Sequence, residues 1–96
     1  MELHEQLEGV KDRQSFLSFV EALIKDRTQA VEAENLHPSS SYAADAGGWE
    51  NTTIEQFLEA AVAWAKDVSE GSTPEFSDEP TWKSFATFLY VGKVYE

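Results

Sequence analysis

The chain has 96 residues, 42% of them hydrophobic, with 18 acidic and 7 basic side chains, a net charge of −11 and no cysteine. A chain of this length forms a single core, and the lack of cysteine excludes disulfides, thiolate metal sites and a cysteine nucleophile. The negative charge disfavours nucleic acids and anionic membranes as partners, since both are bound through clusters of Lys and Arg.

The first strong helical pattern covers residues 13 to 33. Phe16, Val20 and Leu23 recur at steps of three and four, which places them on one side of a helix. Asp12 is the expected N-cap, because its carboxylate can accept from the free amides of the first turn. Before it, Leu3, Leu7 and Val10 have helical spacing and predict at most a short extra helix.

The polar face of this helix is expected to include Asp26 and Arg27, while Phe19 widens the apolar face. From Leu36 to Asn51 the pattern stops, and Pro and Gly residues indicate a long loop. We expect the loop from residue 36 to residue 48 to be the most mobile internal segment, because it has few apolar side chains to offset the entropy of ordering.

A second helix is predicted over residues 53 to 69, where apolar residues repeat by three and four for more than three turns. Thr52 and Glu55 have the spacing of a capping box, and Gly71 can end the helix in the left-handed conformation. Residues 72 to 79 hold Ser, Thr, one Pro and three acidic residues, which indicates a linker.

A third helix is predicted over residues 81 to 91, with Pro80 suited to its first turn. Gly92 either ends this helix or only weakens it, and a helix that reaches the carboxy terminus is the preferred interpretation. The fold expected from these elements is a small all-α, single-domain bundle of three main helices over residues 1–96, with room for a short N-terminal helix. The predicted core consists of Phe16, Val20, Leu23, Phe57, Leu58, Ala61, Trp64, Trp82, Phe85 and Leu89.

No catalytic or metal-binding pattern stands out. His4 and His37 are too far apart in the sequence for a helical zinc pair. His37 with Ser39 and Asp45 could be drawn as a triad, but the serines lack the turn and oxyanion-hole signature of a hydrolase. We therefore expect a protein that is not an enzyme and that has no cofactor and no metal ion.

Trp49 lies outside every periodic stripe, unlike Trp64 and Trp82, which we assign to the core. Trp49 could pack back onto the bundle or stand as an exposed anchor for a partner. Packing is the preferred interpretation, because an indole beside a helix start commonly folds onto that helix.

Several short motifs resemble a small bacterial family of unknown function. They are Trp49-Glu50-Asn51, Phe57-Leu58-Glu59-Ala60 followed by Trp64, Pro80-Thr81-Trp82 with Phe85-Ala86, and Tyr95-Glu96. The resemblance covers about residues 10 to 96, and it implies family membership but no catalytic or binding residues. Gly92 replaces the helix-favouring residue expected at this position in such relatives.

The preferred functional hypothesis is a non-catalytic protein-interaction module. Residues 45 to 79 hold nine acidic residues and one basic residue, and such a surface can steer a basic protein partner. One specific version is an immunity- or antitoxin-like protein that blocks a basic toxin, by analogy of size and charge. The candidate interaction residues are Tyr42, Trp49, Glu50, Asn51, Glu55 and Glu59.

Two alternatives stay open at this point. A small-ligand binding domain could use Trp49, Asn51, Tyr42 and Tyr95. A self-associating structural subunit could use Phe19 and Phe88 as its seam, so the chain is expected to be a monomer or a weak homo-oligomer. The first residues carry no apolar run like that of a secretory signal, which favours a cytoplasmic location.

Overall fold

The computed structural model of the chain describes residues 2–37, 46–70 and 80–95. They form four α-helices, α1 (Leu3–Glu8), α2 (Arg13–Leu36), α3 (Ile54–Glu70) and α4 (Trp82–Val94), and one short 3₁₀ turn, η1 (Ala46–Gly48). The predicted fold class, a small all-α bundle with a short N-terminal helix, is confirmed. The predicted linker over residues 72–79 and most of the predicted mobile loop lie outside the described residues.

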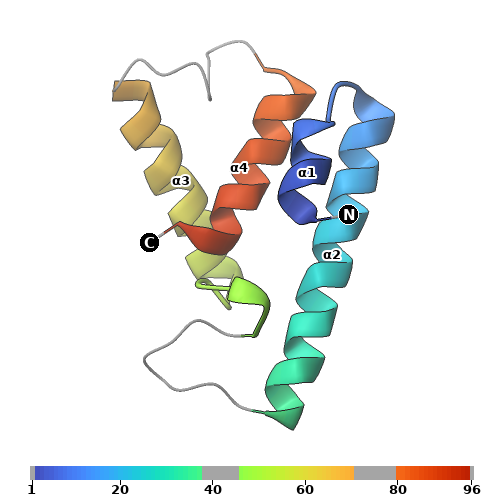
Figure 1. Cartoon of the computed structure of the whole chain (residues 1–96). Helices are drawn as coiled ribbons and strands as arrows, with labels where there is room; N and C mark the ends of the chain where they lie inside the picture. The colour runs from blue at the N-terminus through green and yellow to red at the C-terminus, as the bar shows by residue number, and fades with distance from the viewer. Residues whose placement is uncertain (1, 38–45, 71–79, 96) are drawn as a thin grey trace.

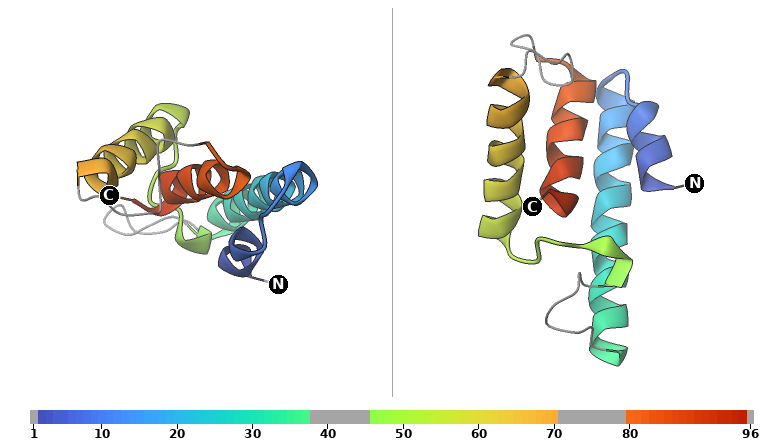
Figure 2. Two further views of the ribbon diagram at one scale, coloured as in Figure 1. Left: turned by 90° about the horizontal axis from the view of Figure 1, so that it is seen from above. Right: turned by 60° about the vertical axis from the view of Figure 1, so that its left-hand side comes forward.

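Helix α4 lies between α2 and α3 (Figure 1). It packs against both of them, whereas α2 and α3 barely approach each other. Seen from above and from the side, the main helices form a single layer, and α1 lies against α2 and α4 (Figure 2). α2 extends beyond the end of α4, and η1 packs against this extension.

The start of α2 follows the prediction from the sequence. The Asp12 carboxylate accepts a hydrogen bond from the Ser15 amide at 2.8 Å, and the Ser15 hydroxyl accepts from the Asp12 amide at 3.1 Å. This exchange satisfies amides that the first turn of a helix leaves without partners. The helix ends at Leu36, three residues later than predicted.

The predicted cap of α3 is wrong by one residue. The Gln56 amide donates to the Thr53 hydroxyl at 3.1 Å, so Thr53 and not Thr52 caps the helix. The Thr52 amide donates to the Gln56 side chain, also at 3.1 Å. Thr53 and Gln56 have the same spacing as Thr52 and Glu55, so the capping box alone could not distinguish the two registers.

The core consists of two clusters of buried residues. One contains Val10, Phe19 and Ala86, and the other contains Leu23, Ala30 and Trp49. Phe19 is only 1% exposed, so its side chain is not available as the predicted seam, while self-association itself stays a prediction. Its ring fills the space between α2 and α4 beside the buried Val10 and Ala86.

Three predicted core residues, Leu58, Trp82 and Phe85, are exposed. The prediction assumed a closed three-helix bundle, in which every apolar stripe meets a neighbour. In the structure α4 lies between α2 and α3, and one of its sides has no helix over it among the described residues. Trp82 and Phe85 of α4 therefore remain accessible, and Leu58 of α3 does so because α2 barely approaches α3.

Helix α4 continues through Gly92 to Val94. Gly92 is buried, and a Cβ atom at this position would lie 2.9 Å from the Phe57 Cζ atom. The absence of a side chain allows the Phe57 ring of α3 to pack directly on the α4 backbone. Gly92 is therefore a packing residue and does not end the helix. Within the described residues, no helix combines the length and the apolar character needed to cross a membrane.

Candidate functional site

The segment between η1 and α3 is fixed to the bundle by Trp49, which is 4% exposed. Its indole Nε1 donates a hydrogen bond to the Asp26 Oδ2 atom of α2 at 2.9 Å. The ring also stacks on Phe57 of α3, with centroids 6.2 Å apart. The preferred interpretation of Trp49, that it packs back onto the bundle, is confirmed.

Two cations complete this arrangement. Lys93 is buried and places its Nζ atom 2.8 Å from the same Asp26 Oδ2 atom and 5.4 Å from the Trp49 ring centroid. The Arg27 Cζ atom lies 5.1 Å from that centroid. Both positions suit a cation–π interaction. We call Asp26, Arg27, Trp49 and Lys93 the tryptophan cluster; it joins α2, the segment before α3 and the end of α4.

Sequence reasoning missed this cluster, because it assigned Asp26 and Arg27 to the solvated face of the helix. In the structure both side chains are half-buried. One signal was present in the sequence. Asp26 and Arg27 each lie three or four residues from Leu23 and from Ala30, which are both buried. They are therefore on the same side of the helix as the buried residues and do not face away from them.

Asn51 caps the C-terminal end of α4. Its side-chain amide donates to the carbonyl oxygens of Gly92 at 3.0 Å and Tyr95 at 2.8 Å, and the Glu50 amide donates to the Lys93 carbonyl at 3.1 Å. The last carbonyls of a helix lack partners within it, so Asn51 has a structural role at this end.

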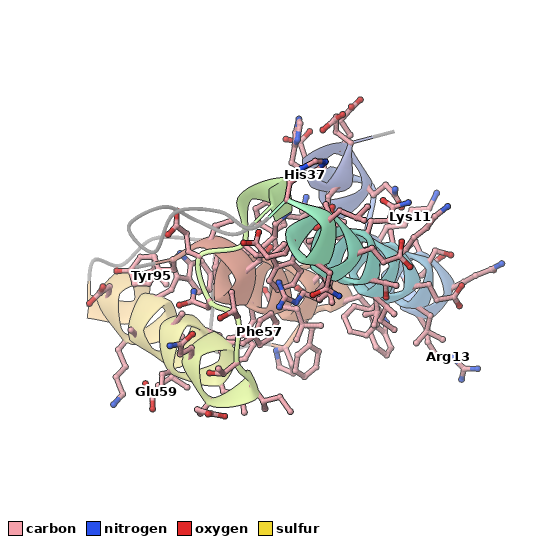
Figure 3. All side chains as sticks on the ribbon, turned by 90° about the horizontal axis from the view of Figure 1, so that it is seen from below. Lys11, Arg13, His37, Phe57, Glu59 and Tyr95 are labelled. Carbon is pink, nitrogen blue, oxygen red and sulfur yellow. The ribbon has the colours of Figure 1, made fainter. Side chains whose placement is uncertain are left out.

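The candidate interaction residues therefore differ in how far they are exposed. Trp49 is buried, Asn51 is half-buried and holds α4, and Tyr42 lies outside the described residues. Glu50, Glu55 and Glu59 are exposed. Figure 3 shows Glu59 on the outer side of α3 and Phe57 turned towards the bundle.

The residues of the small-ligand alternative are placed only in part, since Tyr42 lies outside the described residues. Tyr95, at the end of α4, donates its hydroxyl to the Asp67 carboxylate of α3. This hydrogen bond raises the pKa of Tyr95 above its ordinary value of 10.0. Trp49 and Asn51 line the groove described next, and Tyr95 is not among the residues that line it.

An apolar groove of about 510 Å³ lies between α2 and α3, with Leu89 of α4 among its lining residues. Its walls are formed by Ile24 and Arg27 on α2 and by Ile54 and Leu58 on α3. Ile24 is 61% exposed and Ile54 is 78% exposed. Exposed aliphatic residues gathered at one groove are typical of interaction surfaces, whereas single ones are common everywhere.

The exposed apolar surface extends beyond the groove. On α2, exposed Leu17 lies seven residues before Ile24, and on α4, exposed Phe85 lies four residues before Leu89. Residues at these spacings lie on one side of a helix. On α3, exposed Val62 continues the line of Leu58 in the same way. We call this surface, from Leu17 and Phe85 to Ile54, Leu58 and Val62, the apolar face.

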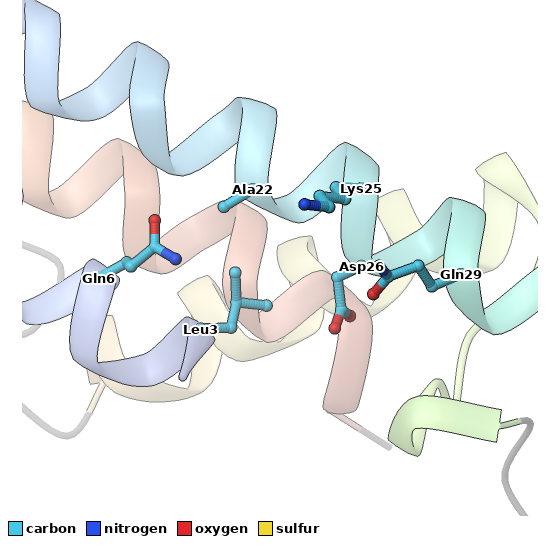
Figure 4. A pocket seen from close by; sticks show the side chains of 6 residues that line it. All are labelled: Leu3, Gln6, Ala22, Lys25, Asp26 and Gln29. Atoms are coloured by element: carbon cyan, nitrogen blue, oxygen red, sulfur yellow. The ribbon is translucent and has the colours of Figure 1, made fainter. Parts of the chain in front are cut away.

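A second hollow, of about 330 Å³, lies between α1 and α2 and is more polar (Figure 4). It is lined by Leu3 and Gln6 of α1 and by Ala22, Lys25, Asp26 and Gln29 of α2. None of these six residues is a hydroxyl, thiol or imidazole nucleophile. The Asp26 carboxylate already accepts hydrogen bonds from Trp49 and Lys93 as part of the tryptophan cluster.

The comparisons with known proteins place the chain in a family. A model described as "Family of unknown function (DUF7660)" matches residues 12–96. The chain belongs to this family, and the resemblance predicted from the aromatic motifs is confirmed at that level. Neither the curated proteins nor the solved structures contain a match to the chain.

Proposed function

We propose that the protein is a non-catalytic protein-interaction module that binds its partner through the apolar face. One observation carries the proposal: on a chain of net charge −11, exposed Ile24, Ile54 and Leu58 surround one groove. When a partner covers their aliphatic surface, the complex is stabilised by roughly 25 cal/mol per Å² of buried area.

The acidic residues of α3 supply the second part of the proposal. Glu55 and Glu59 are exposed on α3: Glu55 lies three residues before Leu58, and Glu59 lies four residues after Glu55, so each pair is a pair of surface neighbours. Carboxylates at the edge of an apolar surface raise the association rate of a basic partner and disfavour acidic ones. This keeps the acidic surface of the sequence-based hypothesis, but Trp49 and Asn51 are replaced as contact residues by the apolar face.

The test compares two variants as bait in an extract of the native host. Ile54→Asn with Leu58→Asn removes apolar surface from the groove without changing the charge. Leu36→Asn is the matched control, because Leu36 is 75% exposed but is not among the residues that line the groove. Circular dichroism would establish that both variants are folded.

A partner bound through the groove should be retained by the wild type and by Leu36→Asn, and be reduced at least about tenfold by the groove variant, a loss of about 1.4 kcal/mol. Equal retention by all three would show that the partner binds elsewhere and would refute the proposal. With a purified partner, Glu55→Lys with Glu59→Lys should slow association by about tenfold and weaken its dependence on salt.

A further inference from the structure

We propose that the occupant of the groove is an amphipathic α-helix of another protein, with an apolar stripe that enters the groove and basic residues that flank the stripe. This inference rests on the proposed function and specifies the partner. Three observations carry it: the chemistry of the groove walls, the geometry of the helices around the groove, and the charge at its edges.

The groove walls favour a helix over an extended peptide. Most of the lining side chains are apolar, as Ile24, Ile54 and Leu89 are. An extended peptide leaves backbone amides and carbonyls that need partners in the groove, and burying them without partners is costly. A helix satisfies these groups within itself and presents only side chains, which is the usual solution in apolar grooves.

The helices around the groove leave a place for one more helix. α4 packs on α2 at one side and on α3 at the other, so the outer two are separated by its width. Packed helices have axes about 8 to 10 Å apart, so a helix packed over α4 would lie farther from α2 and α3 and would reach them through longer side chains. The lining residues of α2, from Val20 to Thr28, span about 12 Å of wall at 1.5 Å per residue.

The edges of the groove are acidic. Glu21 on α2 lies three residues before Ile24, and Glu55 on α3 lies three residues before Leu58, so each is a surface neighbour of a groove residue. Glu59 extends the α3 edge. Among the basic residues, Arg27 lines the groove with its guanidinium over the Trp49 ring, Lys25 lines the other hollow, and Lys66 lies further along α3. The partner helix should therefore carry Lys or Arg beside its apolar stripe.

The same charge disfavours a second copy of the chain as the occupant. Two copies joined through this face would bring their Glu21, Glu55 and Glu59 edges together, on bodies that each carry a net charge of −11. Like charges at an interface oppose association. A basic partner gains from the same edges that would repel another copy.

The experiment uses three synthetic peptides of about 18 residues, roughly five helical turns. The first has Leu at helical positions i, i+3, i+4 and i+7 with Lys beside them. The second replaces every Lys with Glu, and the third keeps the Lys but has two central prolines, which break the helix. Binding to the full chain is measured by fluorescence anisotropy, and contacts are mapped by amide chemical shifts.

The Lys helix should bind at least about tenfold more tightly than either of the other peptides, with shifts at Ile24, Ile54 and Leu58. Ile54→Asn with Leu58→Asn should reduce its affinity by about tenfold, while Leu36→Asn, which keeps the same charge, should leave it unchanged. Equal binding of the proline peptide would overturn the helical occupant, and equal binding of the Glu peptide would overturn the choice of a basic one.

Two further results would also overturn the inference. In the first, the changes in amide chemical shift are confined to the acidic residues of α3 and the groove variant binds the peptide as tightly as the wild type. The peptide would then be held by charge attraction alone. The other is a dimer in sedimentation velocity that Ile54→Asn with Leu58→Asn dissociates, because the occupant is then a second copy. If no peptide binds but a host protein still depends on the groove, the inference fails and the proposed function stands.

Discussion

The tryptophan cluster and the apolar face differ in the kind of side chain that each one buries and exposes. The cluster buries the charged Lys93 beside Asp26, and the apolar face exposes Ile24 and Ile54. Folding alone favours neither arrangement, since charged groups lose hydration on burial and aliphatic groups gain by it. The cluster is understandable because its charges have partners within the chain, whereas the apolar face lacks a covering element among the described residues.

The two regions are also connected. Trp49 and Arg27 belong to the tryptophan cluster, yet both line the groove. The cluster attaches the segment before α3 to α2 and so sets the spacing between the two walls. A rigid wall spacing lowers the cost of binding, because less freedom is lost when the partner arrives. The comparison predicts that changes in the cluster affect folding and that changes on the apolar face affect binding.

The largest effect is expected at Trp49. Trp49→Ala removes a buried indole and should cost about 3 to 5 kcal/mol in the free energy of unfolding, measured by urea denaturation. Trp49→Phe keeps most of the packing but loses the donor to Asp26, and it should cost about 1 to 2 kcal/mol. Trp82→Ala is the control: Trp82 is 39% exposed, so about 1 kcal/mol is expected. Equal losses at both tryptophans would contradict the role given to the cluster.

The next effect is expected where α3 packs on α4. Gly92→Ala places a methyl group 2.9 Å from the Phe57 ring, and this overlap should cost about 1 to 3 kcal/mol despite the better helix propensity of alanine. Gly9→Ala serves as the control, because its Cβ would lie 3.5 Å from the nearest atom outside the adjacent residues. In thermal unfolding, the wild type and Gly9→Ala should have similar melting temperatures, and Gly92→Ala should have a lower one. A stable Gly92→Ala protein would mean that the Phe57 ring can move.

A smaller effect is expected on the wall of the groove than beneath it. Ile54→Asn should change the free energy of unfolding by about 0.5 kcal/mol or less, because Ile54 is 78% exposed. Leu23→Ala, at a buried residue that lines the same groove, should cost about 2 to 4 kcal/mol. A large loss for Ile54→Asn would indicate that the wall contributes to folding, and the apolar face would lose its separate role.

Local patterns in the sequence were sufficient to predict most of the helices. The steps of three and four in α2 and α3, and the cap at Asp12, depend on residues within a few positions of one another. The exposed side of α4 could not be predicted in this way. Phe85 and Trp82 follow a regular stripe, but which side of that stripe is covered depends on how α2 and α3 are placed around it.

The tryptophan cluster was beyond local reasoning for a related cause. Trp49 lies 23 residues from Asp26, and Lys93 lies 67 residues from it, so no spacing rule connects them. The same holds for Gly92, whose meaning comes from the Phe57 ring of another helix. The acidic candidates Glu55 and Glu59 were predicted from charge alone, and their role in binding stays a prediction.

The smallest expected effect concerns the first turn of α2, whose cap residues Asp12 and Ser15 belong to neither region. Hydrogen bonds from the Ser15 backbone amide and then from its side chain lower the pKa of Asp12 below its ordinary value of 3.8. A carboxyl group with a lowered pKa in the folded state stabilises the fold at pH values above the unfolded pKa, and this contribution disappears as the pH falls through the folded pKa.

In Ser15→Ala, an NMR titration should give a higher pKa for Asp12, because the side-chain bond is lost while the backbone bond remains. Ser18→Ala, an exposed serine of the same helix, should leave that pKa unchanged. If Ser15→Ala titrates like the wild type, the hydroxyl's bond to the Asp12 carboxylate does not contribute to the lowered pKa.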